Sequence, residues 1–399
     1  MTAITESISS VENISSLQTT STYDTGNVPV YSYNERIFIA AMFSLISISG
    51  TFGNSLIIAA VLLSKKLRTP TNVFVVNLSI ADLFASLFLS WSVVALLGKD
   101  GWPLPNAEWL CQAGGFVLYT CTGTSLFNLA AIAINRLILI TQSYRTYMRI
   151  YSPFNLALMV ALTWFISFSV ILVFPLLDIG GVGYDEEDFT CSDLDGHPKA
   201  KYFHLAQSAV FYPVPLLTIV ICYSVLFAHV RRHISKQRKN SSAYKFDFPV
   251  LSRSSGSFSS AHVPGRVSTN LDINRMSMSQ FSHQPETPTR RRLRHQRLDN
   301  QQLAITKNLF VIVCVFVLCC SPYCIALILP DNDHFLLYGG IFILTSSAIN
   351  PLVYGSKHPN FKEVLGKLLS CNYEAIPEPS RFLKHLLKTR GLQPSLLQL

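Results

Sequence analysis

The fold class follows from an apolar run near the middle of the chain, which reads AAIAINRLILI over residues 130–140. Within this run, Arg136 carries a guanidinium group that stays protonated under ordinary conditions. An arginine at the centre of a bilayer costs at least about 2.5–3.5 kcal/mol. The run therefore predicts that Arg136 lies near a membrane surface, or that a function holds it among apolar residues.

The composition of the whole chain points to a membrane protein. The chain has 399 residues, of which 49% are hydrophobic and 14% are charged, whereas soluble domains carry about 25% charged residues. In a membrane protein, the distribution of the formal net charge of +9 reports which loops face the cytosol. We therefore expect no nucleic-acid partner. The sequence contains no phosphate-binding glycine loop, no HExxH motif and no GxSxG motif, and we expect no enzymatic activity.

Apolar runs that are long enough to cross a bilayer, about 20 residues each, recur seven times along the chain. They predict an all-α membrane protein, a bundle of seven transmembrane helices followed by a short amphipathic eighth helix over residues 357–371. Five spans fall within residues 37–234 and two within residues 302–356. The seven runs are residues 37–63, 72–97, 111–141, 153–176, 202–230, 304–329 and 335–354.

The charges of the connecting segments predict the orientation. Lys and Arg gather after the first, third and fifth spans, while Asp and Glu gather after the fourth and sixth spans. The positive-inside rule then places the amino terminus outside the plasma membrane and the carboxyl terminus in the cytosol. The acidic residues after the fourth span are Asp178, Asp185, Glu186, Glu187, Asp188, Asp193 and Asp195.

Three segments lie outside the predicted bundle. Residues 1–36 form an extracellular tail that we expect to be disordered, and Asn13 stands in a glycosylation sequon there, although a chance match is an alternative. Residues 235–301 form a long, polar third cytoplasmic loop, which we also expect to be disordered and whose hydroxyls are either kinase substrates or parts of a solvated linker. Residues 372–399 form a cytoplasmic tail.

The cysteines divide by compartment. Of nine cysteines, only Cys111 and Cys191 fall at the outer, oxidising face, so topology predicts a disulfide between them. That bond would hold the acidic loop over the mouth of the bundle. Cys371 follows the amphipathic stretch and is a candidate for palmitoylation, with an unmodified thiol as the alternative.

A carboxylate in the middle of the second span, Asp82, marks a candidate ion site. No Lys or Arg lies at a comparable depth, so its partners are neutral groups. Carboxylate, hydroxyl and amide oxygens together suit a hard monovalent cation such as sodium, and the alternative is an aspartate that is hydrogen-bonded to water without an ion. The candidate ligands are Asp82, Ser125, Ser347 and Asn350.

Short motifs of this chain resemble those of the rhodopsin-like (class A) G-protein-coupled receptors, and they occur in the same order and on the corresponding spans. The resemblance covers about residues 37–371. It rests on Gly53-Asn54, Leu78-Ser79-Ile80-Ala81-Asp82, Cys111, Asn135-Arg136-Leu137, Trp164, Pro215, Tyr223, Phe316, Pro322, Asn350-Pro351-Leu352-Val353-Tyr354 and Phe361.

The resemblance implies an unknown extracellular ligand that enters between spans three, five, six and seven. It also implies heterotrimeric G proteins, arrestin and receptor kinases as cytosolic partners, with nucleotide exchange on the G protein. The implied ligand residues, for which helix packing is the alternative role, are Tyr119, Thr122, His204, Gln207 and Tyr323. The implied coupling residues are Asn135, Arg136, Tyr144, Tyr223, Phe316, Pro322, Asn350, Pro351 and Tyr354.

Departures from the family pattern refine these expectations. The family's Asp-Arg-Tyr is Asn135-Arg136-Leu137 here, and Gln302 stands where span six often has an acid. Neither residue can form a salt bridge with Arg136, so either ligand-free signalling is elevated or other contacts hold the resting state. Leu118 stands where aminergic receptors carry the aspartate that pairs with the amine, and span seven has no lysine to form a Schiff base with retinal. Monoamine and retinal ligands are therefore disfavoured.

Further motifs bear on the receptor subgroup and on two competing classes of protein. Residues 131–136 and 143–152 are similar to melatonin receptors and the orphan receptors near them, although Pro351 replaces their alanine. A transporter or ion-conducting protein is the alternative function, but no internal repeat supports it. An intramembrane hydrolase would need a second buried carboxylate, and Asp82 has no such companion.

Overall fold

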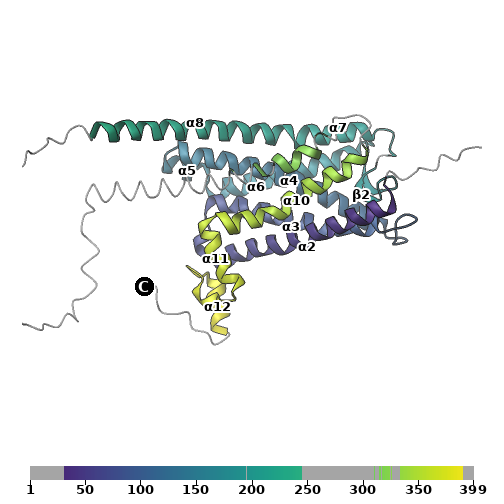
Figure 1. Ribbon diagram of the computed structural model, residues 1–399, viewed down its shortest axis with the longest axis horizontal. Coiled ribbons are helices and arrows are strands. Elements are labelled where there is room, and N and C mark those ends of the chain that lie inside the picture. The colour runs from purple at the N-terminus through teal and green to yellow at the C-terminus, as the bar shows by residue number, and fades with distance from the viewer. Residues whose placement is uncertain are drawn as a thin grey trace, which may run out of the picture.

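In a computed structural model, the helices run side by side along one long axis (Figure 1). The structure describes residues 31–194, 196–244, 310, 314–315, 317–323, 325 and 333–389. Side chains are not described for residues 233–244 and 333–334. The expectations for Asn13, Gln302 and Phe316, and for residues 245–301, lie outside the described residues.

Six of the described helices are long and apolar enough to cross a membrane. They are α2 (Tyr33–Leu63), α3 (Pro70–Leu96), α4 (Glu108–Thr141), α6 (Pro153–Leu176), α7 (Ala200–Phe211) continued by α8 (Pro213–Tyr244), and α10 (Asp333–Lys357). Of the predicted sixth span, the described residues are helical. The shorter helices are η1 (Lys65–Leu67), α5 (Tyr144–Ile150), α11 (Pro359–Leu369), η2 (Tyr373–Ala375) and α12 (Arg381–Thr389).

Local sequence signals start most of these helices. The Ser32 hydroxyl accepts a hydrogen bond from the Glu35 amide and the Glu35 carboxylate accepts from the Ser32 amide, so a capping box begins α2. Thr69 and Ser152 cap α3 and α6, and each is followed by a proline in the first turn. The start of α2 at Tyr33 corrects the predicted boundary at residue 37, because the capping box precedes the apolar run.

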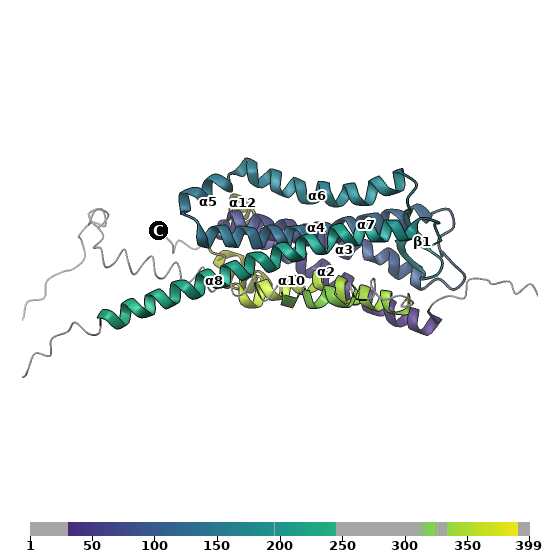
Figure 2. The same cartoon turned by 90° about the horizontal axis from the view of Figure 1, so that it is seen from above.

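The central helix is α4, which packs against α3, α6 and α8 and against a small hairpin at one end of the bundle (Figure 2). The hairpin lies in a loop of the helical fold, and its strands β1 (Val182–Asp185) and β2 (Thr190–Asp193) pair antiparallel. Cys111 at the start of α4 forms a disulfide with Cys191 in β2. The predicted disulfide is thereby confirmed, and the acidic loop is held at one end of the bundle.

Helix continues into the segment that the sequence predicts as a disordered loop over residues 235–301. The sequence favoured disorder from residue 235, but α8 continues as helix to Tyr244. This stretch is rich in Lys, Arg and Gln, contains neither Pro nor Gly, and follows an already formed helix. Extending a helix adds one hydrogen bond per ordered residue without a new nucleation step, so the polar residues prolong it.

Candidate functional site

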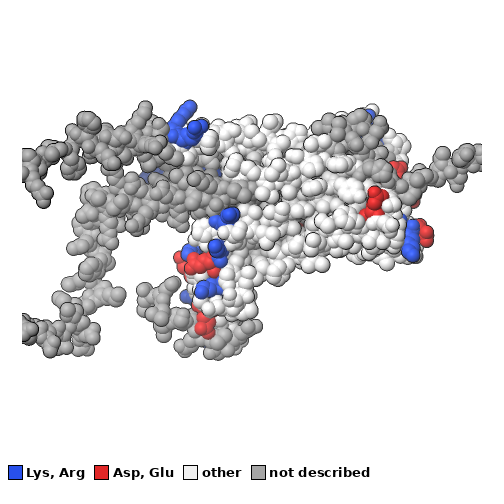
Figure 3. Space-filling model, in the orientation of Figure 1, with Lys and Arg blue, Asp and Glu red and all other residues white. Residues whose placement is uncertain are grey.

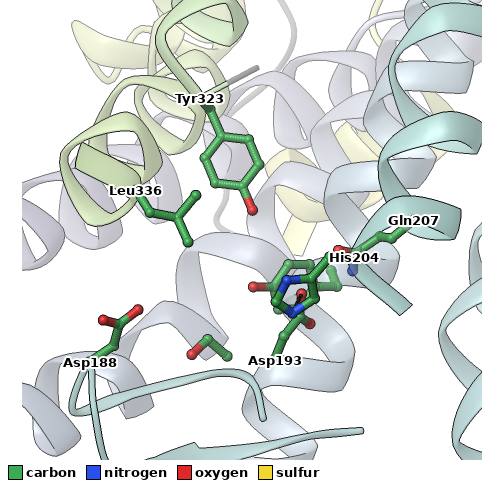
Figure 4. Close-up of a pocket in the computed structure, with 8 residues that line it drawn as sticks. Asp188, Asp193, His204, Gln207, Tyr323 and Leu336 are labelled. Carbon is green, nitrogen blue, oxygen red and sulfur yellow. Dashed lines mark ion pairs between the residues drawn. The ribbon is translucent and has the colours of Figure 1, made fainter. Parts of the chain in front are cut away.

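A cavity opens at the end of the bundle that carries the hairpin. About 310 Å³ of space that is free of atoms, open solvent included, lies between the hairpin, α4, α7 and the ends of the sixth and seventh spans that are near the hairpin (Figure 4). Its lining residues are Tyr119, Asp188, Ser192, Asp193, His204, Gln207, Tyr323 and Leu336.

Four of the five predicted ligand residues line this cavity, and the fifth does not. Thr122 lies on α4, where its hydroxyl donates to the Leu118 carbonyl at 2.8 Å instead of reaching the cavity. A threonine in a helix commonly bonds to the carbonyl one turn earlier, so this contact is local in origin. We therefore replace Thr122 in the candidate site by hairpin residues.

The cavity is acidic and polar. Asp188 and Asp193 are 8% and 7% exposed, and Asp193 Oδ2 lies 3.4 Å from His204 Nε2. No Lys or Arg is among the lining residues. Gln207 is buried, and its amide nitrogen has no hydrogen-bond partner among the described residues. The site therefore offers negative charge together with a donor that no described residue satisfies.

Sequence reasoning missed the two carboxylates as lining residues because the acidic loop contains seven acids without a distinguishing local pattern. The hairpin register and the Cys111–Cys191 bond decide which ones turn inward. Sequence reasoning also missed Arg36, which is buried at the amino-terminal end of α2. Its guanidinium donates to the Gly98 carbonyl at 2.8 Å and lies 3.7 Å from the centre of the Phe189 ring, on the hairpin turn.

In the middle of the bundle, Asp82 joins three helices. The Ser125 hydroxyl of α4 donates to Asp82 Oδ1 at 2.8 Å, and the Asn350 amide of α10 donates to Asp82 Oδ2 at 2.8 Å. The Asn54 amide of α2 donates to the main-chain carbonyl of Ser347 at 3.0 Å. All four predicted ion-site residues thus belong to one polar region that links α2, α3, α4 and α10.

At the opposite end from the cavity, Arg136 is buried without an acidic partner. It is 3% exposed, and none of the described carboxylates forms an ion pair with it. The phenols of Tyr223, Tyr147 and Tyr354 lie within electrostatic reach of it. The hydroxyls of Tyr223 and Tyr354 have no hydrogen-bond partner among the described residues. Phenol groups, and no described carboxylate, therefore surround the charge.

The neighbouring Asn135 is held by two neutral side-chain hydrogen bonds. It is fully buried; its side-chain oxygen accepts from the Thr71 hydroxyl at 2.7 Å, and its amide donates to the Tyr147 hydroxyl at 3.2 Å. These bonds connect α3, α4 and α5. Tyr144, on the same short helix α5, is 75% exposed and is available to a partner.

The remaining predicted coupling residues lie along the sixth and seventh spans. Pro322 is in a described helical piece and is half-buried, while Pro351 is buried inside α10.

His358 follows α10, and its burial, with a smaller contribution from the Arg136 charge, lowers its pKa to about 4. Cys371, the candidate for palmitoylation, is exposed just beyond α11.

The model of the seven-transmembrane receptor family (rhodopsin family) matches residues 53–354 of this chain. The chain belongs to the rhodopsin family of seven-transmembrane receptors. The fold class predicted from the sequence is thereby confirmed, including the sixth span that the structure describes only in part.

Individual relatives in the rhodopsin family agree with this assignment. The "G-protein coupled receptor moody" of Drosophila melanogaster is 30% identical, over 90% of this chain and 54% of that protein. The melatonin receptor type 1B-B of Danio rerio is 31% identical, over 51% of this chain and 57% of that receptor. The chain spans about half the length of these curated relatives. The resemblance to melatonin receptors noted in the sequence is thus confirmed as a similarity.

A solved structure supports the fold alone. The crystal structure of squid rhodopsin matches with a TM-score of 0.62 and 18% identity, over 92% of this chain and 93% of that one. The six described membrane-crossing helices and the family match make this chain a multi-pass membrane protein.

Proposed function

We propose that this rhodopsin-family chain is a receptor that binds an extracellular ligand in the hairpin cavity and activates heterotrimeric G proteins at the Arg136 end. The observation that carries the proposal is the placement of a polar, acidic cavity at one end of the bundle and, at the other, a buried arginine without an acidic partner among the described residues. Between them, the flank of the bundle in Figure 3 is almost free of charged residues, as a membrane-embedded surface must be.

The proposed orientation places the cavity outside the plasma membrane. The Cys111–Cys191 disulfide at that end supports it, because disulfides persist in oxidising compartments. Glycosylation of Asn13 and palmitoylation of Cys371 would follow from the same orientation. Digestion with a glycosidase and hydroxylamine-sensitive acyl labelling, each compared with the Asn13→Gln or Cys371→Ser variant, test these two modifications.

The chemistry of the cavity favours a ligand with a cationic group and a hydrogen-bond acceptor. Asp188 and Asp193 supply negative charge with no lining Lys or Arg, and the Gln207 amide supplies a donor. A small number of polar anchors inside a concave site is the usual arrangement for a receptor ligand. Leu118 in place of an aspartate makes a monoamine held at α4 a poor fit.

The test is ligand-driven GTP exchange in membranes that contain the receptor and a G protein from each class in turn. A cationic agonist should lose about ten-fold or more in potency in Asp193→Asn, because one buried charge pair is removed. Asp178→Asn is the matched control, since that carboxylate is exposed and lies outside the cavity. Equal potency in the wild type and in Asp188→Asn and Asp193→Asn would refute the cationic ligand.

Coupling is proposed to run through Arg136. Nucleotide exchange takes place on the G protein, so the receptor itself performs no catalysis, and arrestin and receptor kinases are proposed to act on the same face. Arg136→Ala should abolish exchange while the receptor still reaches the cell surface and binds ligand. Ion flux without GTP exchange in the same cells would instead favour a transporter.

An allosteric sodium ion is proposed at Asp82, because the residues present fit a hard cation. The carboxylate and the Ser125 hydroxyl supply oxygen, and the buried Asn54 side-chain oxygen has no hydrogen-bond partner among the described residues. A bound ion would balance the Asp82 charge, which the described residues meet only with neutral donors. The same hydrogen bonds hold α3, α4 and α10 together in its absence.

A further inference from the structure

The segment after α11 folds back onto the first cytosolic loop. The Lys65 amide donates to the Glu378 carbonyl at 2.8 Å, and the Ser380 amide donates to the Leu63 carbonyl at 2.8 Å. The Ser64 hydroxyl donates to the Pro377 carbonyl at 2.6 Å. We call residues 376–389 the clasp. Three hydrogen bonds therefore fasten the clasp to the last residue of the membrane-crossing helix α2 and to the two residues after it.

One side of the clasp is used for this attachment. Ile376, Leu383 and Leu387 are each no more than 3% exposed and belong to the same apolar cluster as Leu63. Leu383 and Leu387 are four residues apart, so they occupy one face of α12. This face explains why the helix forms where it does, and the rest of α12 remains uncovered.

A second apolar face of α12 has no covering in the described structure. Phe382 is 58% exposed and Leu386 is 40% exposed, and their four-residue spacing places them side by side. The remaining exposed positions of α12 include Arg381, Lys384 and Lys388, and the helix contains no Asp or Glu. An amphipathic helix with a basic polar side is the pattern that binds the surface of an anionic bilayer.

The position of α12 brings it to such a surface. In Figure 1 it lies to the side of the bundle, next to the end of α2 and beyond α11. Leu62, the residue before the attachment point, is 55% exposed on the flank of a membrane-crossing helix. Of the nearby acids, Glu363 pairs with Lys66 at 2.8 Å, and Glu374 and Glu378 lie before the first residue of α12, which itself carries three basic residues and no acid.

We propose that α12 is a second membrane-surface helix, which binds anionic phospholipid through Phe382, Leu386 and the basic residues Arg381, Lys384 and Lys388. The clasp holds the helix at the level where α2 leaves the bilayer, so the exposed apolar pair enters the boundary between headgroups and acyl chains. The anionic lipid follows from the proposed cytosolic orientation of this end, because that leaflet carries the negative lipids. The contact with the membrane surface does not depend on that orientation, because it follows from the attachment of the clasp to the end of α2.

The test uses the full-length receptor in nanodiscs made of phosphatidylcholine, with or without phosphatidylserine, and with bromine on the acyl chains. In Phe382→Trp the added tryptophan fluorescence should be quenched, and more so with phosphatidylserine. His385→Trp is the matched control on the basic side of the same helix, and its added fluorescence should stay unquenched. Equal, weak quenching at both positions would overturn the proposal and leave a protein partner as the occupant of this face.

The charge contribution is tested in the same discs with Lys384→Gln/Lys388→Gln in the Phe382→Trp background. Each basic residue near an anionic surface strengthens binding by about five-fold, so loss of two lysines should lower the binding constant of α12 for phosphatidylserine discs by more than ten-fold. The measured sign of this loss is a decrease in the phosphatidylserine-dependent quenching. Hydrogen exchange of the Lys65 and Ser380 amides should stay slow, which shows that the clasp is intact. Unchanged quenching with slow exchange would contradict the role of the lysines.

Discussion

At the scale of single residues, Asn135 decides how the neighbouring arginine is held at rest. It replaces an acid, yet its side chain is fully used, since it accepts from Thr71 and donates to Tyr147. Arg136 itself lacks an acidic partner among the described residues. Neutral hydrogen bonds of Asn135 join α3, α4 and α5 beside Arg136, and we expect a change at Asn135 to alter ligand-free signalling.

We expect Asn135→Asp to lower ligand-free GTP exchange. The carboxylate can still accept from both the Thr71 and Tyr147 hydroxyls, and it adds a negative charge beside Arg136, which strengthens the resting arrangement by about 1 kcal/mol or more. Asn135→Ala removes both bonds and should raise exchange. Exchange is measured in membranes with matched receptor amounts, and Arg136→Ala supplies the floor. An Asn135→Asp receptor as active as the wild type would show that Asn135 does not set the resting state.

His358 should make the receptor sensitive to acid. Its folded pKa of about 4 lies below the ordinary value of 6.5, so between these values the unfolded chain binds more protons than the folded one. Stability is then unaffected above about pH 6.5 and falls as the pH drops towards 4, by at most about 3 kcal/mol.

The measurement is the thermal unfolding midpoint of the purified receptor at pH 7 and pH 5. His358→Gln should reduce the difference between the two midpoints, while His385→Gln, at an exposed position, should leave it unchanged. A pH difference that is the same in both variants and the wild type would rule out His358 as its source.

At the scale of elements, α2 and α10 approach closely because Gly53 has no side chain. A Cβ built on Gly53 would lie 2.9 Å from Cβ and Cγ of Pro351, which is buried inside α10. The ring of Pro351 is rigid and cannot move aside as a flexible side chain would. The contact therefore requires glycine, although glycine is a poor helix former.

We expect Gly53→Ala to destabilise the receptor by about 1–3 kcal/mol, because the helices must separate to make room. Gly366→Ala is the matched control, since no atom lies within 4 Å of the added Cβ and α11 gains about 1 kcal/mol of helix propensity. Thermal unfolding of both variants in the same detergent measures the contrast. If Gly53→Ala were as stable as Gly366→Ala, the close approach of α2 and α10 would not be a constraint.

At the scale of the whole molecule, Asp82 lies between the hairpin cavity and the end of the bundle that carries Arg136. Its two hydrogen bonds reach α4 and α10, the helices that also carry Arg136 and Tyr354. A ligand or ion acts on coupling only by binding one arrangement of these helices more tightly than another. The proposed sodium ion would stabilise the arrangement in which the three helices meet at Asp82.

We expect sodium to lower ligand-free GTP exchange in the wild type and to have no such effect in Asp82→Asn. The substitution removes the charge that the ion balances and keeps a side chain of similar size. Exchange is measured in sodium chloride and in N-methylglucamine chloride of equal ionic strength. Asp178→Asn should respond to sodium like the wild type. A sodium response that persists in Asp82→Asn would place any cation elsewhere, and no response in the wild type would leave Asp82 as a hydrogen-bonded carboxylate without an ion.

The sequence by itself determined the membrane class, the positions of most spans and the pairing of Cys111 with Cys191. The spans depend on local hydropathy, which is readable within short windows of the chain, and the cysteine pairing depends on the compartment in which the predicted topology places each cysteine. Helix ends were less accurate, as α8 shows, because a polar stretch that continues a formed helix looks like a loop in composition.

Only the tertiary structure decided which side chains meet. It brought Asp193 to His204, Thr71 to Asn135, and residues 376–380 to the end of α2. It also excluded Thr122 from the cavity. These contacts join segments far apart in the chain, and they depend on how helices rotate and approach one another. Hydropathy sets which residues enter the membrane, whereas packing around glycine, proline and the disulfide sets which of the many similar polar groups lie within bonding distance.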